Sequence, residues 1–356
     1  MSRLCGSIGR RCLLPGLLYV FALCCPAHVG AGTYSYLSLL GRQDPVQYFT
    51  CPAGVCVDSS GSIFAVDAAR PQLLKFHASG SLQWRRSLVA VARSDLWLNY
   101  PYDVRLLPNG NIAILNGLPA LIAELDSAGR LLWLSTWPDS NQYGSPGGIG
   151  VDTDGNIFVS EARNVKIHKF GPSGVWLSAF GVAGRDPGEL MAPCGIAFDP
   201  QGNLAVADNN LNKVQKYDAS GAYTGWSCGS SSPPHEGDPD PGKFYGLTAV
   251  AIASNGMVYA LDSMGCFVNK FDANGTYIGR FGGYGKSDQQ FLDPNRMALQ
   301  SLSLLWIADS DSCMLKKMDT DTGNCLLKIG SPGILEDLAQ VACGCHIGLS
   351  RELLCG

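Results

Sequence analysis

Acidic residues recur at one place in a repeating pattern. Five apolar runs end in an acid and a sixth ends in an amide, at Asp67, Asn116, Glu161, Asp208, Asp262 and Asp309. Carboxylate oxygens are ligands for hard cations, so a ring of these acids could face a metal or a basic ligand. A short acid at the end of a strand also accepts bonds from the backbone N–H groups of the next turn. Because the acid returns in nearly every copy, we favour this local role. We retain Asp208, Asp262 and Asp309 as candidate metal ligands, with calcium or zinc as the ion.

Histidine and cysteine supply a second kind of metal chemistry. Zinc needs three or four converging ligands, often histidines. After the N-terminal 31 residues the histidines are His77, His168, His235 and His346, and their spacing gives no such set. The tail places Cys343, Cys345 and His346 close to Cys355, which could hold zinc or form disulfides. We favour disulfides, because the spacing differs from that of a structural zinc knuckle.

The remaining cysteines favour the same interpretation. Ten cysteines follow the N-terminal segment, and an even number behind a secretory leader is typical of a disulfide framework. They are Cys51, Cys56, Cys194, Cys228, Cys266, Cys313, Cys325, Cys343, Cys345 and Cys355. The spacing does not determine their pairing.

Two enlarged connections are candidates for binding. The connection over residues 227–246 carries hard-ligand side chains that could meet calcium, namely His235, Glu236, Asp238 and Asp240. The connection over residues 92–102 carries aromatic side chains that could grip a sugar or a peptide, namely Trp97, Tyr100 and Tyr102. Solvated loops and surface packing are the alternative interpretations. Asn274-Gly-Thr276 is an acceptor sequence for N-glycosylation in an expected turn.

The elements that must position these residues form a repeat. Six copies of the apolar run occur at intervals of 45 to 54 residues, beginning at Gly61, Gly110, Gly155, Gly202, Gly256 and Ser303. Each copy predicts four antiparallel strands: a short apolar strand, a strand buried on both faces, an alternating strand and an outer strand. Six such repeats predict an all-β fold, a six-bladed β-propeller.

The consensus also carries a family resemblance. Stretches such as Pro193-Cys-Gly-Ile-Ala-Phe-Asp199, Gly202-Asn-Leu-Ala-Val-Ala-Asp208 and Lys216-Tyr-Asp218 recur, with Phe-Gly after the outer strand. Over about residues 40 to 330 the chain resembles NHL-repeat proteins. The resemblance implies a six-bladed propeller. The family includes a peptide-amidating lyase with zinc-bound histidines, and no matching trio occurs here. A seven-bladed antibiotic-inactivating lyase is similar in repeat style, but its blade count differs.

Ring closure has two candidate strands for one place. Residues 33–41 form a candidate outer strand, and the following residues resemble a normal connection between blades. Residues 325–329 form another candidate for the sixth repeat. We expect the N-terminal strand to close the ring.

The N-terminal segment predicts export. Arg3, Arg10 and Arg11 precede an apolar core of 13 residues at 13–25, and small residues allow cleavage after Ala31. We therefore expect a signal peptide at 1–31, a propeller at 32–330 and a cysteine-rich tail at 331–356, in a secreted or lumenal protein. A mitochondrial presequence is the alternative, since no acid precedes Asp44. No later segment is long enough to span a membrane.

Composition limits the partners. Hydrophobic residues make up 46% of the chain and charged residues 16%, as suits a well-buried core. The formal net charge is −4 and no basic stripe occurs, which argues against nucleic-acid binding. We expect a monomeric binding scaffold for a protein, peptide or glycan, with no enzymatic activity and no cofactor. The alternative is a metal-dependent lyase or hydrolase at the mouth of the propeller axis, using Asp208, Asp262 and loop acids.

Overall fold

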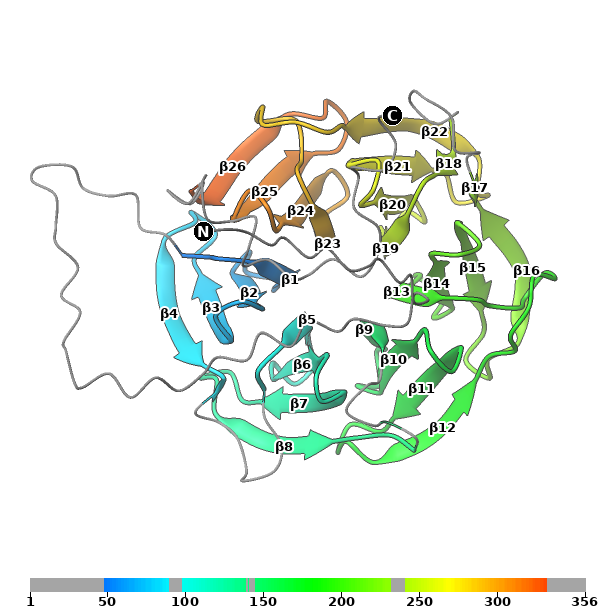
Figure 1. The fold of residues 1–356 in the computed structure, drawn as a ribbon, viewed down its shortest axis with the longest axis horizontal. Helices are drawn as coiled ribbons and strands as arrows, with labels where there is room; N and C mark the ends of the chain where they lie inside the picture. Colours follow the sequence, from blue (N-terminus) through cyan, green and yellow to red (C-terminus); the bar gives the residue numbers. More distant parts are fainter. Residues whose placement is uncertain (1–47, 90–97, 139, 141–144, 232–240, 332–356) are drawn as a thin grey trace, which may run out of the picture. The chain divides into compact units, whose positions relative to one another are not determined.

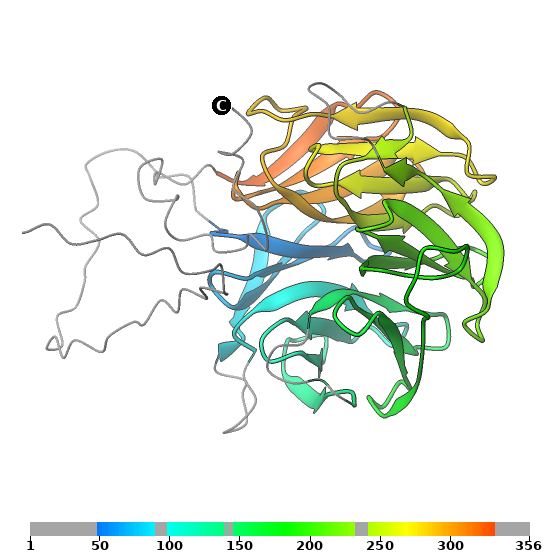
Figure 2. The same cartoon turned by 45° about the vertical axis from the view of Figure 1, so that its right-hand side comes forward.

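The computed structural model describes residues 48–89, 98–138, 140, 145–231 and 241–331. These residues belong to one compact unit, 44–356. They form six four-stranded antiparallel sheets and one two-stranded pair. The sheets follow one another around a centre as the blades of a propeller (Figure 1), and Figure 2 shows the same blades after a turn of 45°. The predicted six-bladed fold is therefore confirmed. Among the described residues no helix is long and apolar enough to cross a membrane.

The four strands of each blade follow one another in sequence, from the innermost to the outermost. Blade one contains β1 (Pro52–Val57), β2 (Ile63–Asp67), β3 (Gln72–Phe76) and β4 (Leu82–Ser87), and blade two contains β5 (Pro101–Leu106), β6 (Ile112–Asn116), β7 (Leu121–Leu125) and β8 (Leu131–Ser135). Blade three contains β9 (Pro146–Val151), β10 (Ile157–Glu161), β11 (Lys166–Phe170) and β12 (Trp176–Phe180), and blade four contains β13 (Pro193–Phe198), β14 (Leu204–Asp208), β15 (Lys213–Tyr217) and β16 (Tyr223–Cys228). Blade five contains β19 (Leu247–Ile252), β20 (Val258–Asp262), β21 (Phe267–Phe271) and β22 (Tyr277–Gly282), and blade six contains β23 (Pro294–Ser301), β24 (Leu304–Asp309), β25 (Met314–Asp319) and β26 (Cys325–Gly330).

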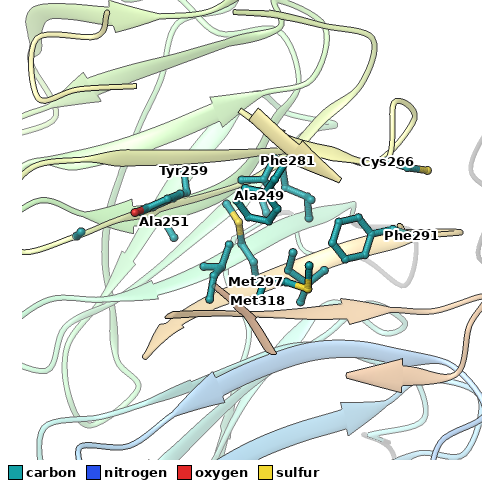
Figure 3. Close-up of a cluster of buried hydrophobic side chains, with 13 residues drawn as sticks. Ala249, Ala251, Tyr259, Cys266, Phe281, Phe291, Met297 and Met318 are labelled. Carbon is teal, nitrogen blue, oxygen red and sulfur yellow. The ribbon is translucent and has the colours of Figure 1, made fainter. Parts of the chain in front are cut away.

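Burial follows the predicted pattern of each blade. Every residue of β2, β6, β10, β14 and β20 is buried, because both faces of a second strand pack against neighbouring blades. The outer strand β12 is exposed along most of its length. The core therefore lies between blades rather than in one central mass. Figure 3 shows one such interface, where Met297 and Met318 of blade six pack against Ala249, Tyr259 and Phe281 of blade five.

The inner strands pack closely enough to require glycine. A Cβ atom at Gly195 on β13 would lie 2.5 Å from the Ala249 Cα and 2.8 Å from the Thr248 carbonyl oxygen, both on β19. Those atoms are backbone and cannot rotate away. Glycine at this position therefore sets the distance between blades four and five near the axis.

We expect Gly195→Ala to lower the free energy of unfolding by about 1–3 kcal/mol, since it overpacks a backbone contact. Chemical denaturation measures the change. Gly171→Ala is the matched control, because the nearest atom to a Cβ there is 3.7 Å away on Leu177. That control is expected to be neutral or slightly stabilising. Equal effects of the two substitutions would contradict the close-packing explanation.

Ring closure differs from the expectation. The fourth strand of blade six is β26, which pairs with β25 from Met314↔Gly330 to Met318↔Cys325. The expected N-terminal strand, residues 33–41, lies outside the described residues, and the place it was expected to take is occupied. Blade six therefore comes entirely from the C-terminal repeat, and side chains join it to blade one. The Ser310 hydroxyl donates to the Pro52 carbonyl over 2.7 Å, and the Cys313 thiol donates to the Thr50 carbonyl.

The two ends of the long connection after β16 are held together by a short pair of strands. Here β17 (Ser230–Ser231) pairs in parallel with β18 (Lys243–Phe244). Phe244 is fully buried, and it packs 6.1 Å from Phe271 of blade five between ring centroids. The ends of this connection are thus anchored to the propeller.

Candidate functional site

The repeated acids hold the connections between blades. Asp208 accepts hydrogen bonds from the backbone N–H groups of Met191 and Ala192, and Asp262 accepts them from Tyr245 and Gly246. Asp67 and Asp309 accept corresponding bonds from residues 16 or 17 positions earlier. All four side chains are buried. Their carboxylates fix the chain as it enters each blade. Asp208 also accepts bonds from the N–H groups of Asn210 and Leu211 in the turn after its strand, which is the expected local role.

This geometry bears on the candidate metal ligands Asp208, Asp262 and Asp309. Each carboxylate is engaged within its own blade, and Asp309 also meets Lys316 Nζ at 3.3 Å. Burial raises the pKa of Asp262, against the lowering effect of its backbone hydrogen bonds. Among the described residues no three His, Cys, Asp or Glu side chains gather as a metal site would require. The structure therefore gives no geometric support for a cation at these acids.

Two blades vary the pattern. Asn116 accepts a bond from the Tyr100 N–H and donates to the Pro119 carbonyl. Glu161 lies 3.0 Å from His168 Nε2 and accepts a bond from the Trp137 indole N–H. Burial opposes the charge of Glu161, yet the hydrogen bond with His168 leaves its pKa below the usual value. Both residues stay inside the blade-to-blade packing and face no open surface.

The remaining candidates are placed as follows. Tyr100 and Tyr102 stack with ring centroids 6.5 Å apart, so part of the expected aromatic connection is brought together. Asn274 is exposed in the turn before β22, as the acceptor sequence requires. The other binding candidates, Trp97, His235, Glu236, Asp238 and Asp240, lie outside the described residues.

No disulfide joins the described cysteines, contrary to the expected framework. The described cysteines are Cys51, Cys56, Cys194, Cys228, Cys266, Cys313 and Cys325, while Cys343, Cys345 and Cys355 lie outside the described residues. Several thiols instead approach backbone carbonyls: Cys194 contacts those of Ala207 and Leu247. Burial raises the pKa of Cys194 and of Cys228 to about 12. These cysteines behave as packed, protonated side chains.

A charged cluster lies at the axis, where sequence reasoning did not place one. Arg296 on β23 reaches across the ring: its Nη2 donates to the Gly147 carbonyl on β9, and its Nε lies 3.4 Å from Asp103 Oδ2 on β5. Arg105, also on β5, donates from Nη1 to Asp103 Oδ1 over 2.7 Å. The Tyr102 ring covers the Arg296 guanidinium with its centroid 4.4 Å away. We call Tyr102, Asp103, Arg105 and Arg296 the axial cluster.

Burial makes the axial cluster electrostatically strong. Arg296 is 2% exposed and Asp103 is fully buried. Burial opposes the charge of Arg296, but Tyr102 and Asp103 favour it, and the pKa of the guanidinium is raised overall. Asp103 Oδ2 and Arg296 Nε make no hydrogen bond within the described residues, so only their mutual attraction compensates their desolvation. The cluster links blades two, three and six across the axis.

A sequence signal for the axial cluster was present in the inner strands. The third residue of the inner strand is small in four blades, at Gly54, Gly148, Gly195 and Ala249. In the other two blades it is Asp103 and Arg296. Opposite charges at the only two large positions of a ring indicate a pair, provided that the ring is closed and the strands are in register.

Comparison with known proteins supports the fold. No family model matches the chain, and no curated protein matches it. Among solved structures, a streptogramin B lyase is 13% identical with a TM-score of 0.56, over 79% of this chain and 83% of that chain. A catalytically inactive virginiamycin B lyase from Staphylococcus aureus with quinupristin is 13% identical with a TM-score of 0.55, over 83% of this chain and 88% of that chain. A protein of unknown function from Bacteroides thetaiotaomicron is 14% identical with a TM-score of 0.55, over 74% of this chain and 67% of that chain.

These comparisons define the class of the protein and correct one expectation. At such identities the likeness establishes a β-propeller fold, and the NHL-repeat assignment stays a prediction. The expectation that the chain has no enzymatic activity is contradicted, because propellers similar to it are lyases. Secretion and the binding of a protein, peptide or glycan are tested by none of these observations and stay predictions.

Proposed function

We propose that the chain is a lyase or hydrolase with its site at the propeller axis, built on the axial cluster. The observation that carries this proposal is the convergence of two guanidiniums, a carboxylate and a phenol from two blades that break the repeat. Structural side chains in a repeat follow its symmetry, whereas these four depart from it. The similar lyases support the choice of reaction class.

The cluster contains the groups that such a reaction requires. Elimination and ester hydrolysis both develop negative charge on an oxygen, which a preorganised guanidinium stabilises. Asp103 holds Arg105 and Arg296 in position through short contacts. Tyr102 is only partly buried and carries a hydroxyl, so it is the member placed to transfer a proton. We assign Arg105 to charge stabilisation, Asp103 and the buried Arg296 to positioning, and Tyr102 to proton transfer.

The test is turnover by the purified full chain. Quinupristin and a panel of lactones and carboxylate esters are incubated with the protein, and products are followed by mass spectrometry. We expect at least one compound to be consumed, and Tyr102→Phe to slow its consumption about 100-fold or more through loss of proton transfer. Tyr223→Phe on the outer strand β16 is the matched control and is expected to keep the rate. Failure to consume any compound, or an unchanged rate in Tyr102→Phe, would contradict the proposal.

A further inference from the structure

Within the described residues, hydrogen bonds hold Arg105 through only one of its nitrogens. Its Nη1 donates to Asp103 Oδ1 at 2.7 Å and to the Val104 carbonyl at 2.8 Å, and it lies 3.5 Å from the Val55 carbonyl. Within the described residues, all of its hydrogen bonds start from Nη1. The side chain is 19% exposed, whereas Arg296 is 2% exposed. The Nε and Nη2 edge of Arg105 is therefore fixed in position. It makes no hydrogen bond within the described residues, so a ligand can bind to it.

The equivalent positions around the ring are small. Arg105 pairs with Ala113 on β6, and five other inner-strand residues hold the same register in their blades. These residues are Cys56, Gly150, Ala197, Ala251 and Ala298. At this level of the six inner strands Arg105 is thus the one charged side chain. A ligand that reaches this level of the inner strands would meet one charged group, the Arg105 guanidinium.

The charges near Arg105 leave a positive excess. Arg105 and Arg296 carry two positive charges and share the single negative charge of Asp103, which leaves one positive charge. The neighbouring thiols do not neutralise it, since burial raises the pKa of Cys56 and that of Cys194, the latter to about 12. Asp58 in the next turn is a charged carboxylate, but its oxygen accepts bonds from the N–H groups of Ser60 and Ser62, and within the described residues it forms no ion pair with Arg105. An ordered guanidinium edge with one uncompensated charge suits a monoanion with two oxygens.

We propose that Arg105 binds a carboxylate group of the substrate through its Nε and Nη2 edge. This proposal rests on the proposed function and names the substrate class of the same site, a carboxylate-bearing small molecule. Arg296 is too deeply buried to meet the ligand directly. It supplies the second positive charge, which keeps Asp103 from neutralising Arg105.

The test compares two probes that differ in charge and little in shape. Benzoate and benzamide are titrated separately into the full chain, and binding is followed by calorimetry and by ligand-observed nuclear magnetic resonance. We expect saturable binding of benzoate, at least tenfold weaker binding of benzamide, and at least tenfold weaker benzoate binding in Arg105→Met. Arg105→Lys keeps the charge without the planar fork and is expected to fall between these two proteins. Arg86→Met, on the outer strand β4, is the matched control and is expected to bind benzoate as the unmodified chain does.

Three results would overturn the inference: no saturable binding of benzoate, equal binding of the two probes, or unchanged binding in Arg105→Met. The comparison of probes uses the unmodified chain, so it stands even where a variant fails to fold. Failure of this inference is distinguishable from failure of the proposed function. Benzoate binding without turnover of any compound would sustain the anion site and reject the enzyme. Turnover of a compound that Tyr102→Phe slows, without saturable binding of benzoate, would do the reverse.

Discussion

Asp103→Leu is expected to lower the free energy of unfolding by about 3–5 kcal/mol, because it leaves a buried guanidinium without its counter-charge. Asp103 is fully buried and contacts both Arg105 and Arg296. Arg105 is partly exposed, so water can solvate it after the substitution. Arg296 is enclosed by the inner strands, so its charge would remain desolvated and without a partner. Urea denaturation followed by tryptophan fluorescence measures the loss.

The control removes the second charge as well. In the double variant Asp103→Leu/Arg296→Met, both members of the buried pair become apolar side chains of related size. Replacing a whole buried pair is often neutral, whereas breaking it is not. We therefore expect the double variant to regain most of the stability that Asp103→Leu loses. Should the double variant be less stable than Asp103→Leu, the pair would not act as a charge-compensated unit.

The fold was predictable because the same sequence pattern occurs in six repeats. Alternation, turn glycines and a buried second strand are local properties, and each copy supports the others. The backbone role of Asp208 and Asp262 was predictable for the same reason, since a strand-end acid acts on a turn close to it in space. Local patterns of this kind can be recognised in the sequence without knowledge of the complete ring.

The axial cluster was not predictable in that way. Arg296 meets Asp103 and Gly147, which precede it by nearly 200 and 149 residues, so only the closed ring brings them together. The small residues of the inner strands contain the signal, since Asp103 and Arg296 stand where the other blades have glycine or alanine. The cysteines misled for a different reason. Their even number is what an oxidising compartment predicts, whereas the structure places the thiols of Cys194 and Cys313 against backbone carbonyls.

The prediction that the N-terminal strand closes the ring was wrong because two segments have equally suitable local sequences. Both candidates are short and apolar, and sequence phase alone favoured the N-terminal one. The continuity of blade six decides against it, since β26 follows β25 directly and pairs along its length. The seam between blades one and six then depends on side-chain packing. Fully buried Trp306 on β24 lies in that packing, against Val55, Ala65 and Phe49 of blade one.

Trp306→Ala is therefore expected to lower the free energy of unfolding by about 3–5 kcal/mol, as removal of a fully buried aromatic side chain does. It also removes the hydrogen bond of 3.0 Å from the indole N–H to Gln300 Oε1. The loss should be concentrated at the seam, because blades one and six lie at opposite ends of the described chain and, as between the other blades, no strand pairing joins them. Hydrogen–deuterium exchange should therefore rise first in β1, β2, β24 and β25.

Phe158→Ala supplies the matched comparison for the seam. Phe158 occupies the equivalent position on β10 and packs towards blade four, with its ring 5.1 Å from that of Phe198. Blades three and four are joined by the continuous chain, so the faster exchange in Phe158→Ala should stay between them and leave blades one and six protected. If Trp306→Ala produced the same exchange pattern as Phe158→Ala, or cost less than about 1 kcal/mol, the seam would not be held by this packing. A loss confined to the terminal blades would instead show that the ring closes by side chains from the two ends of the described propeller.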